Sequence, residues 1–257
     1  MARIHDAALV RPDLQRDPAW SLYALADLVP EHSAQADWYA PDDGGRCAVL
    51  LYRSFGFSIF VDSGDFDAVR ETIADLKDEG SFYISIRQPT LELLRGAGYR
   101  IAQPKHMLPM QLDHERFQSV PSAAVRLSPT DLPQLKALYL DGTVGGESPE
   151  SFLDSMMNQG VYYSTPADDG FAAAAGTHVF APEEDVAGVG NTYTRRDKRR
   201  CGYARKATTA VLNELVGHGV GTICLNAAVA NEGAIALYRS LSFEVHSEYF
   251  EGHAVRE

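Results

Sequence analysis

The stretch RRDKRRCGYARKAT, Arg195 to Thr208, places seven basic side chains in a chain whose formal net charge is −12. Arg199, Gly202 and Ala204 form the pattern R-x-x-G-x-A, between a predicted strand that ends near Thr194 and a predicted helix. A glycine allows a tight backbone turn, and the first turn of a helix leaves N–H groups without helical partners. Such a turn binds anions, and a pyrophosphate fits it best. The alternative is a solvated basic turn that binds nothing.

The overall composition is that of an ordinary globular protein. The chain has 257 residues, of which 45% are hydrophobic and 23% are charged. This length fits one large or two smaller domains, and we expect two. The acidic balance disfavours a general nucleic-acid binder, which needs a basic face. Cys47, Cys201 and Cys224 are widely separated, which predicts neither a disulfide framework nor a zinc site.

No stretch of the sequence resembles a targeting or membrane-spanning segment. The first residues carry charges where a signal peptide has an apolar core, and no run of about 20 apolar residues follows. We therefore expect a cytoplasmic protein that does not bind membranes.

Outward from the basic stretch, the second half of the chain alternates predicted strands and helices. The predicted helices are 128–140, 149–157, 202–219 and 231–241, and the predicted strands are 124–127, 161–165, 171–180, 185–194, 222–229 and 243–250. The last strand is expected to close this half.

The first half shows a similar order of elements. Its predicted helices are 18–28, 65–77 and 90–98, and its predicted strands are 47–53, 57–62, 82–87 and the extended run 99–112. Both halves end in strand, helix, strand, helix, strand, which indicates two copies of one architecture. The small polar segment 118–124 then predicts a boundary between domains 1–120 and 121–257.

The two predicted copies differ in the residues that carry chemistry. Aligning their last helices places Leu94 opposite Tyr238 and Arg87 opposite Asn231. The first half also has no basic glycine loop. Any chemistry is therefore expected in the second half.

Two segments together, VGNTYTRRDKRRCGYARKA and LNAAVANEGAIALYRSLSFEV, resemble the GNAT superfamily of N-acyltransferases. In that family an R-x-x-G-x-A/G loop is followed by an N-x-x-A-x-x-L-Y-x-x-x-G-F segment. Asn231, Tyr238 and Phe243 stand in that spacing, whereas Ser242 replaces the usual glycine. The resemblance covers about residues 124–250, and the first half resembles the degenerate GNAT-like domain of tandem members.

The resemblance implies an α/β fold of two GNAT-like domains, each a mixed, mostly antiparallel sheet flanked by helices. It also implies acetyl-CoA as co-substrate, with no metal. The pyrophosphate would lie on the loop, among basic side chains, and the pantetheine arm would pair with the preceding strand. The implied acetyl-CoA-binding residues are Asn191, Thr192, Tyr193, Thr194, Arg199, Arg200, Cys201, Gly202, Tyr203, Ala204, Arg205, Lys206 and Asn231.

The family resemblance also assigns a proton donor. Tyr238 would protonate the leaving thiolate, because a phenol with a pKa near 10 stays protonated at neutral pH. Spacing alone equally fits a core aromatic residue. Asn231 can be both the N-cap of its helix and a contact of the pantetheine or of a water.

The general base is a separate question. His178, in AGTHVF, is the candidate base, because imidazole titrates near neutral pH, although a histidine in an apolar strand is more often structural. Glu147, in DGTVGGESPE, would contact a cationic acceptor, belong to the solvated surface or supply charge at the start of a helix.

These observations favour an acetyl-CoA-dependent N-acetyltransferase that moves an acetyl group to a primary amine by direct attack. The alternatives are an inactive acyl-CoA-binding sensor and a structural partner that acts through an apolar patch on its first half. The expected partners are acetyl-CoA and an amine acceptor, in a monomer or homodimer.

Overall fold

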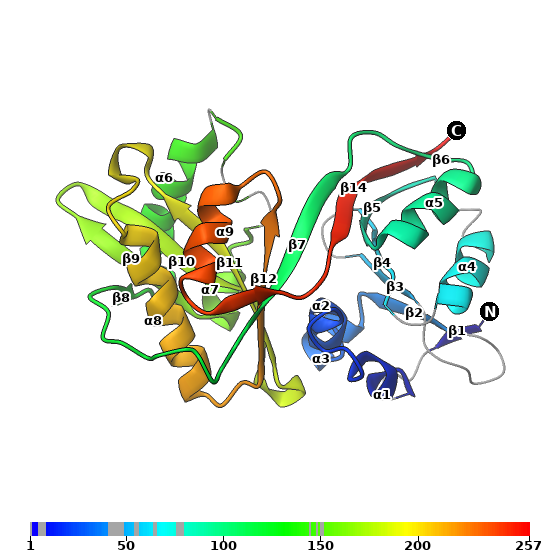
Figure 1. Ribbon diagram of the computed structural model, residues 1–257, viewed down its shortest axis with the longest axis horizontal. Helices are drawn as coiled ribbons and strands as arrows, with labels where there is room; N and C mark the ends of the chain where they lie inside the picture. The colour runs from blue at the N-terminus through cyan, green and yellow to red at the C-terminus, as the bar shows by residue number, and fades with distance from the viewer. Residues whose placement is uncertain are drawn as a thin grey trace. The chain divides into compact units, whose positions relative to one another are not determined.

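The computed structural model describes residues 2–4, 9–40, 49–53, 57–63, 66–75, 80–143, 145–147, 149 and 152–257 (Figure 1). Contacts divide the chain into two compact units. The first unit contains residues 1–110, 227–232 and 245–257, and the second contains residues 111–226 and 233–244.

The first unit is built on a mixed sheet with strand order β1-β2-β3-β4-β5-β14-β7. Its strands are β1 (Ala2–Ile4), β2 (Ala36–Ala40), β3 (Val49–Tyr52), β4 (Ile59–Val61), β5 (Ser81–Ile86), β6 (Tyr99–Ile101), β7 (Lys105–Leu112) and β14 (Tyr249–Arg256). Only the pair β4–β5 is parallel among the ladders that the structure describes in this unit, while β14 runs antiparallel to β5, β6 and β7.

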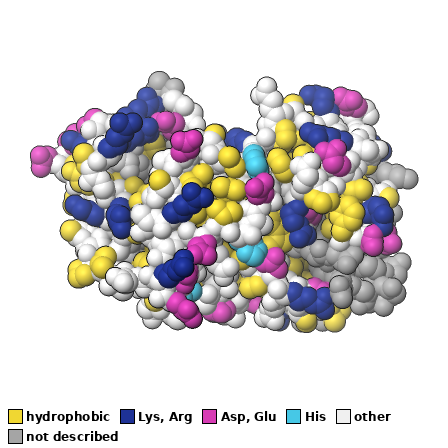
Figure 2. All heavy atoms as spheres, viewed as in Figure 1, with side chains coloured by type: hydrophobic (Ala, Val, Ile, Leu, Met, Phe, Trp, Pro, Cys, Tyr) yellow, Lys and Arg dark blue, Asp and Glu magenta, His cyan; other side chains and the backbone are white. Residues whose placement is uncertain are grey.

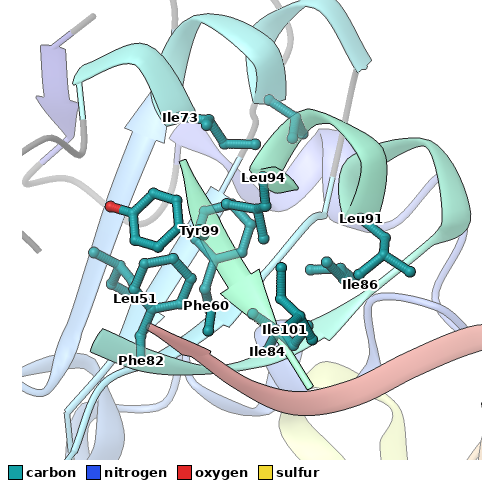
Figure 3. Close-up of a cluster of buried hydrophobic side chains, with 12 residues drawn as sticks. Leu51, Phe60, Ile73, Phe82, Ile84, Ile86, Leu91, Leu94, Tyr99 and Ile101 are labelled. Carbon is teal, nitrogen blue, oxygen red and sulfur yellow. The ribbon is translucent and has the colours of Figure 1, made fainter. Parts of the chain in front are cut away.

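Two helices of the first unit pack apolar side chains on this sheet. The helices of the unit are α1 (Arg11–Leu14), α2 (Leu22–Ala26), α3 (Pro30–Ser33), α4 (Phe66–Asp75) and α5 (Gln88–Gly96). Figure 3 shows the core, where side chains from α4 and α5 meet those of the strands. Leu94 of α5 is fully buried in this core. The position that aligns with Tyr238 is therefore an apolar packing residue in the first unit.

The second unit has a sheet of strand order β12-β11-β10-β9-β8. Its strands are β8 (Val125–Arg126), β9 (Tyr162–Ala167), β10 (Gly170–Ala181), β11 (Val186–Thr194), β12 (Thr222–Ala228) and β13 (Phe243–Val245). Its helices are α6 (Leu132–Thr143), α7 (Met156–Gln159), α8 (Tyr203–Gly217) and α9 (Glu232–Arg239), with short 3-10 turns at Pro129–Asp131, Pro182–Glu184 and Arg196–Lys198. Strands β8 to β11 are antiparallel, and β12 is parallel to β11.

Helix α8 connects the two parallel strands and packs against β9, β10 and β11 (Figure 1). A second cluster of buried side chains joins α6 and α7 to the sheet, and it includes Leu135, Tyr139, Tyr162 and Tyr193. The long apolar run in β10 is explained by this packing, because residues 172–175 are alanines with no exposed surface.

The two units repeat one order of elements. Each contains a strand, a helix and a strand parallel to the first, then a second helix and a short strand, which are β4-α4-β5-α5-β6 and β11-α8-β12-α9-β13. In both, a residue with positive φ follows the second helix, namely Gly98 (φ 89°) and Ser242 (φ 69°). This left-handed position favours glycine. Ser242 therefore has the left-handed backbone conformation that accounts for the glycine usually found at this place in the motif.

Several predicted elements differ from the structure. The predicted strand 243–250 is wrong, because β13 ends at Val245 and β14 begins at Tyr249 and pairs with β5, in the first unit. The contact division consequently differs from the predicted boundary at 120/121, since the last strand belongs to the first unit. Strands β1 and β2 were not predicted.

The predicted helices also differ in extent. The predicted helix 149–157 is reduced to the four residues of α7, and Phe152 before it packs its ring against Tyr139 and Tyr162 instead. The predicted helix 18–28 is reduced to α2. Both ends of the predicted helix 65–77, the segment 54–56 between the predicted strands 47–53 and 57–62, and Cys47 lie outside the described residues.

Candidate functional site

The parallel strands β11 and β12 separate partway along their length. Their register runs from Val186, opposite Thr222, to Val189, opposite Leu225, and the described pairing ends there. β11 continues to Thr194, and over this part β10 is its one partner among the described strands. A bulge occurs at Asn191, whose φ is 51°. One edge of residues 190–194 is therefore available for an extended ligand to pair with.

The turn after β11 leads directly into the N-terminus of α8. Arg200 (φ 60°) and Gly202 (φ 77°) both have left-handed backbone conformations, and Gly202 is the N-cap without any side-chain cap. The first helical bond runs from the N–H of Lys206 to the carbonyl of Gly202, at 3.1 Å. The N–H groups of residues 203–205 thus have no helical partner, which makes the turn a site for an anion.

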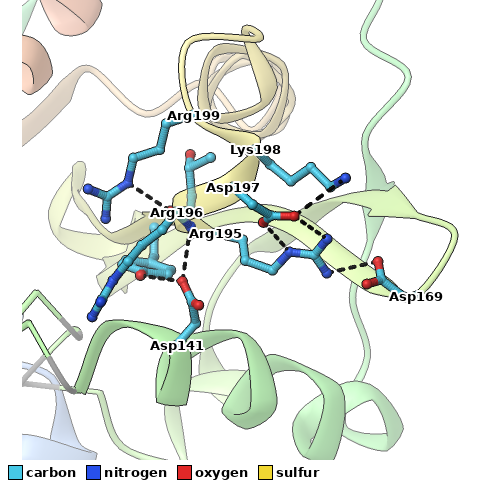
Figure 4. Close-up of polar contacts among 9 residues, drawn as sticks. Asp141, Asp169, Arg195, Arg196, Asp197, Lys198 and Arg199 are labelled. Atoms are coloured by element: carbon cyan, nitrogen blue, oxygen red, sulfur yellow. Dashed lines mark hydrogen bonds and ion pairs between the residues drawn. The ribbon is translucent and has the colours of Figure 1, made fainter.

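Much of the positive charge near this turn is already paired within the protein (Figure 4). Arg195 donates to Asp169 at 2.8 Å and to Asp197 at 2.6 Å. Lys198 lies 3.6 Å from Asp197. The sequence suggested that the basic stretch serves a ligand, but these pairs show that part of it stabilises the turn. Figure 2 likewise shows basic side chains interspersed with acidic ones on the visible face.

Two carboxylates from α6 and the segment after it reach the same turn. Asp141 accepts hydrogen bonds from the Tyr193 hydroxyl (2.8 Å) and the Arg196 N–H (3.0 Å), which lower the pKa of Asp141. Glu147 binds Arg199 through both carboxylate oxygens, at 3.2 and 2.6 Å, and this pairing lowers the pKa of Glu147. Glu147 is therefore an internal partner of the predicted phosphate-binding arginine in this structure.

Three basic side chains of the stretch have no ion pair within the described residues: Arg200, Arg205 and Lys206. Arg200 is exposed. Arg205 donates to the carbonyl of Ser240 at 3.1 Å, and Lys206 lies over the Tyr203 ring at 5.5 Å. These side chains can approach an anion at the turn without breaking a salt bridge. The exposed thiol of Cys201 donates to the carbonyl of Arg199 at 3.4 Å.

Tyr238 comes from α9 and lies near the separated part of β11. Its side chain is buried, and burial raises the pKa of the phenol, while the nearby Thr192 hydroxyl lowers it. The phenol is therefore protonated at neutral pH. Thr192 Oγ1 is itself buried and has no partner of acceptable hydrogen-bond geometry among the described residues. A polar ligand at the end of β11 would satisfy that hydroxyl.

His178 belongs to a hydrogen-bond network centred on the buried Asn191. Its Nε2 lies 3.0 Å from Asn191 Oδ1, and Asn191 Nδ2 donates to the Tyr162 hydroxyl at 2.7 Å. Tyr162 has one hydroxyl proton and donates it to the carbonyl of Thr177, at 2.8 Å. Tyr162 must therefore accept from Asn191, so Asn191 Oδ1 accepts from His178. The network fixes the tautomer of His178 that carries its proton on Nε2.

The same network explains two features of β11. The carbonyl of Asn191 accepts a hydrogen bond from the Tyr139 hydroxyl at 2.7 Å, which helps to hold the bulge. A Cβ atom at Gly190 would lie 2.6 Å from the His178 ring, so only glycine fits beside it. The Asn191 side chain is thus committed to this network, and its backbone carbonyl is committed to Tyr139.

His178 should make protein stability depend on pH. Burial lowers the pKa of the imidazole, against the opposing effect of the Asn191 hydrogen bond. Below pH of about 6.5 the unfolded chain takes up a proton that native His178 resists, so stability falls by up to about 1.4 kcal/mol per pH unit. His178→Gln lacks this contribution. Urea unfolding measures the free energy of unfolding of both proteins. The difference between the wild type and His178→Gln should therefore decrease from about pH 7 to about pH 5.5. A difference in free energy of unfolding that does not change with pH would contradict the lowered pKa of His178.

The structure brings most of the predicted site residues to one region of the second unit. Residues 191–194 and 199–205 form the strand edge and the turn, and Tyr238 lies beside Thr192. Asn231 is exposed immediately before α9, and its N–H donates to the carbonyl of Ala228 at 2.8 Å. The roles of Asp141, Tyr139 and Tyr162 were not predicted. They depend on contacts that no local sequence pattern indicates.

The described residues contain neither a metal-binding group nor a membrane-spanning helix. No group of three or more His, Cys, Asp or Glu side chains could hold a metal ion there. In the same part of the chain, no helix is long and apolar enough to cross a membrane.

Comparisons with known proteins agree with this geometry. The sequence model of the acetyltransferase (GNAT) family matches residues 133–243. A curated relative, the ribosomal protein bS18 alanine N-acetyltransferase of Salmonella typhimurium, is 32% identical over 117 residues, which cover 46% of this chain and 77% of the relative.

Solved structures with a similar fold cover nearly the whole chain. A putative acetyltransferase of the GNAT family from Novosphingobium aromaticivorans has a TM-score of 0.63 at 19% identity, over 93% of this chain and 97% of that one. A tandem GNAT protein from the clavulanic acid biosynthesis pathway has a TM-score of 0.53 at 15% identity, over 86% and 82%. At these identities the likeness shows the fold alone. It confirms the predicted mixed α/β fold with a mainly antiparallel sheet flanked by helices.

Proposed function

The chain belongs to the GNAT family of acetyltransferases, and from that premise we propose that it is an N-acetyltransferase that moves an acetyl group from acetyl-CoA to a primary amine by direct attack. One observation carries the proposal: β11 separates from β12 and leads into a glycine turn at the N-terminus of α8. An extended ligand with a phosphate end matches that arrangement.

The residues at this place fit acetyl-CoA in three respects. The first-turn N–H groups of α8 lack helical partners, which suits a pyrophosphate. Arg200, Arg205 and Lys206 supply positive charge that is not committed to carboxylates within the described residues. The buried Thr192 Oγ1, beside the strand edge and near Tyr238, has no hydrogen-bond partner of acceptable geometry among the described residues. We assign the pyrophosphate to residues 200–204 and the pantetheine arm to residues 191–194.

Acetyl-CoA supplies the thioester carbonyl that the amine attacks. We assign the polarisation of that carbonyl to backbone N–H groups at the bulge of β11. Tyr238 holds the proton that the leaving thiolate needs, because burial keeps its phenol protonated. His178 accepts the amine proton at Nδ1 in this scheme, since Nε2 donates to Asn191. Asn231 lies directly before α9, the helix that carries Tyr238.

We also propose that the first unit is a degenerate copy of the second. Both units repeat the same order of elements around one parallel strand pair. In the first unit, however, that pair is closed by bonds between Asp62 and Arg87: the Arg87 N–H donates to Asp62 Oδ2 and its guanidinium to the Asp62 carbonyl, both at 3.0 Å. Among the described residues, these bonds lie where the two strands would have to separate to admit a pantetheine arm. Leu94, in the place of Tyr238, offers no proton.

The acceptor is proposed to be a primary amine, and the relatives suggest where to start. The Salmonella relative is named for transfer to an alanine of a ribosomal protein. The test is release of free CoA from acetyl-CoA by the full-length protein, with a panel of alkylamines, amino acids and a peptide that begins with alanine. Acetylated product with one class of amine supports the proposal. Tight acetyl-CoA binding without turnover on any amine would favour the acyl-CoA sensor instead.

Glu147 should compete with acetyl-CoA for Arg199. The Glu147→Gln variant removes the negative charge that holds Arg199, so we expect acetyl-CoA to bind about two- to fivefold more tightly, the range typical of exposed ion pairs. Calorimetric titration measures this. Asp169→Asn is the matched control, because it releases Arg195 instead. Equal changes in both variants would mean that Arg199 does not take part in binding.

A further inference from the structure

The first unit contains a pocket that none of the proposed acetyl-transfer steps uses. Its volume is about 510 Å³, which is in the range of small-molecule sites. It is lined by the segment around α1, by the end of β4 and by the first turns of α4 and α5. All of its lining residues belong to the first unit.

A buried carboxylate with an unsatisfied oxygen lines this pocket. Asp62 has 1% of its surface exposed. Its Oδ2 accepts hydrogen bonds from the Arg87 N–H and from the Thr90 hydroxyl, but its Oδ1 has no hydrogen-bond partner among the described residues. Burial raises the pKa of Asp62 to about 6, against the opposing effects of Arg87, of Thr90 and of backbone N–H groups. A hydrogen-bond donor or a cation would relieve this cost of burial.

The two arginine side chains of the pocket already interact with other groups of the protein. The Arg87 guanidinium lies over the Trp20 ring at 4.9 Å and donates to the Asp62 carbonyl. Arg16 pairs with Asp13 at 3.2 Å. The third carboxylate, Asp17, lies 2.9 Å from His246, which balances it only when the imidazole is protonated. With three carboxylates and two guanidiniums, the pocket therefore favours a positive ligand over a negative one.

Apolar side chains form the remaining wall. Trp20, Phe66, Val69 and Pro89 line the pocket, and Phe66 is 44% exposed in the protein. A ligand that fits this wall carries a compact apolar body, and one that fits Asp62 carries an N–H donor with positive charge.

We propose that the pocket of the first unit binds a small organic ammonium compound with an apolar or aromatic body, with its ammonium group directed to Asp62. This inference does not depend on acetyl transfer by the second unit. A phosphate-bearing ligand is disfavoured, because the pocket presents carboxylates and its arginines are paired. If Asp62 served only to anchor α5 through Arg87 and Thr90, the pocket would show no preference for cations.

Benzylamine is the probe that tests the proposal, because it is an aromatic body with one ammonium group. The chain has two tryptophans, Trp20 and Trp38, and only Trp20 lines the pocket. Binding to the full-length protein should change tryptophan fluorescence saturably with a dissociation constant below about 1 mM. Benzoate and benzyl alcohol, which keep the ring without the positive charge, should bind at least about tenfold more weakly.

Variants then separate the pocket from other amine sites. Asp62→Asn keeps the shape and the acceptor for Thr90, and it should weaken benzylamine at least about tenfold. If that variant fails to fold, Phe66→Ala tests the exposed wall and should weaken benzylamine severalfold. Asp67→Asn, an exposed neighbour that pairs with Arg70, is the matched control and should leave binding unchanged. No saturable signal up to about 10 mM benzylamine, or equal binding of benzoate, would overturn the proposal.

Discussion

Replacing Tyr238 with phenylalanine is expected to lower kcat for acetyl transfer by about 100-fold, the usual contribution of a positioned general acid. The substitution removes one hydroxyl and keeps the ring that packs against Phe243, with 6.0 Å between ring centroids. Binding of acetyl-CoA should change little, because the proposed phosphate and pantetheine contacts come from other residues. Steady-state kinetics together with calorimetric titration measure the two quantities separately.

A matched substitution isolates the role of this phenol. Tyr163 is another tyrosine of the second unit, and its hydroxyl donates to Glu214 at 2.7 Å. Tyr163→Phe should leave kcat close to that of the wild type. If Tyr238→Phe turned over as fast as Tyr163→Phe, Tyr238 would be a packing residue, and the thiolate would take its proton from another source.

Replacing Gly202 with aspartate is expected to weaken acetyl-CoA binding by about 100-fold, or roughly 2.7 kcal/mol of binding free energy. The loss has two causes, because the variant weakens the hydrogen bonds to the phosphates and adds charge repulsion. Gly202 has a φ of 77°, and no atom lies within 4 Å of a Cβ built there. The added side chain therefore meets backbone strain and the proposed phosphates rather than a packing clash. Affinity is measured by calorimetric titration, and folding is checked by thermal unfolding.

The opposite end of α8 provides the control for strain alone. Gly219, just beyond the helix, has a φ of 78°. The helix has 15 residues, so its two ends lie about 22 Å apart. Gly219→Asp should lower stability by a similar amount and leave acetyl-CoA affinity unchanged. Equal affinities of the Gly202 and Gly219 variants would contradict the assignment of the glycine turn.

Local sequence patterns were sufficient to predict the main features of the second unit. The glycine turn requires positive φ at Gly202, and glycine is the residue that supplies it at least cost. The apolar positions of α8 and α9 follow the helical period, so both helices were predicted close to their observed bounds. These features depend on residues that are near one another in sequence.

The last strand shows where such patterns fail. Alternation predicts an extended segment at 243–250, but it cannot say which partner that segment pairs with. β14 pairs with β5, whose residues lie about 170 positions earlier, for example Phe250 opposite Ile86. Burial of Ala254 in the first core supports this pairing. The local pattern thus could not predict a pairing between segments that are distant in the sequence.

The charge balance of the basic stretch was also beyond prediction. Asp141 and Glu147 lie about 50 residues before the arginines they contact, and their carboxylates arrive through the packing of α6 on the sheet. Local sequence patterns identified the basic stretch and its glycine turn, but not the carboxylates that pair with its side chains. The structure shows that Arg195, Arg196, Lys198 and Arg199 have carboxylate partners.

The measurement that tests the central claim most directly is calorimetric titration of acetyl-CoA into the full-length protein. The full chain is required, because a fragment that starts near Ser122 would contain β14 without its partner β5. We predict saturable binding at one site per chain that weakens with added salt, as expected for phosphates held by Arg, Lys and helix N–H groups. No binding by the folded protein would contradict the assignment of β11, the glycine turn and α8 as the acetyl-CoA site.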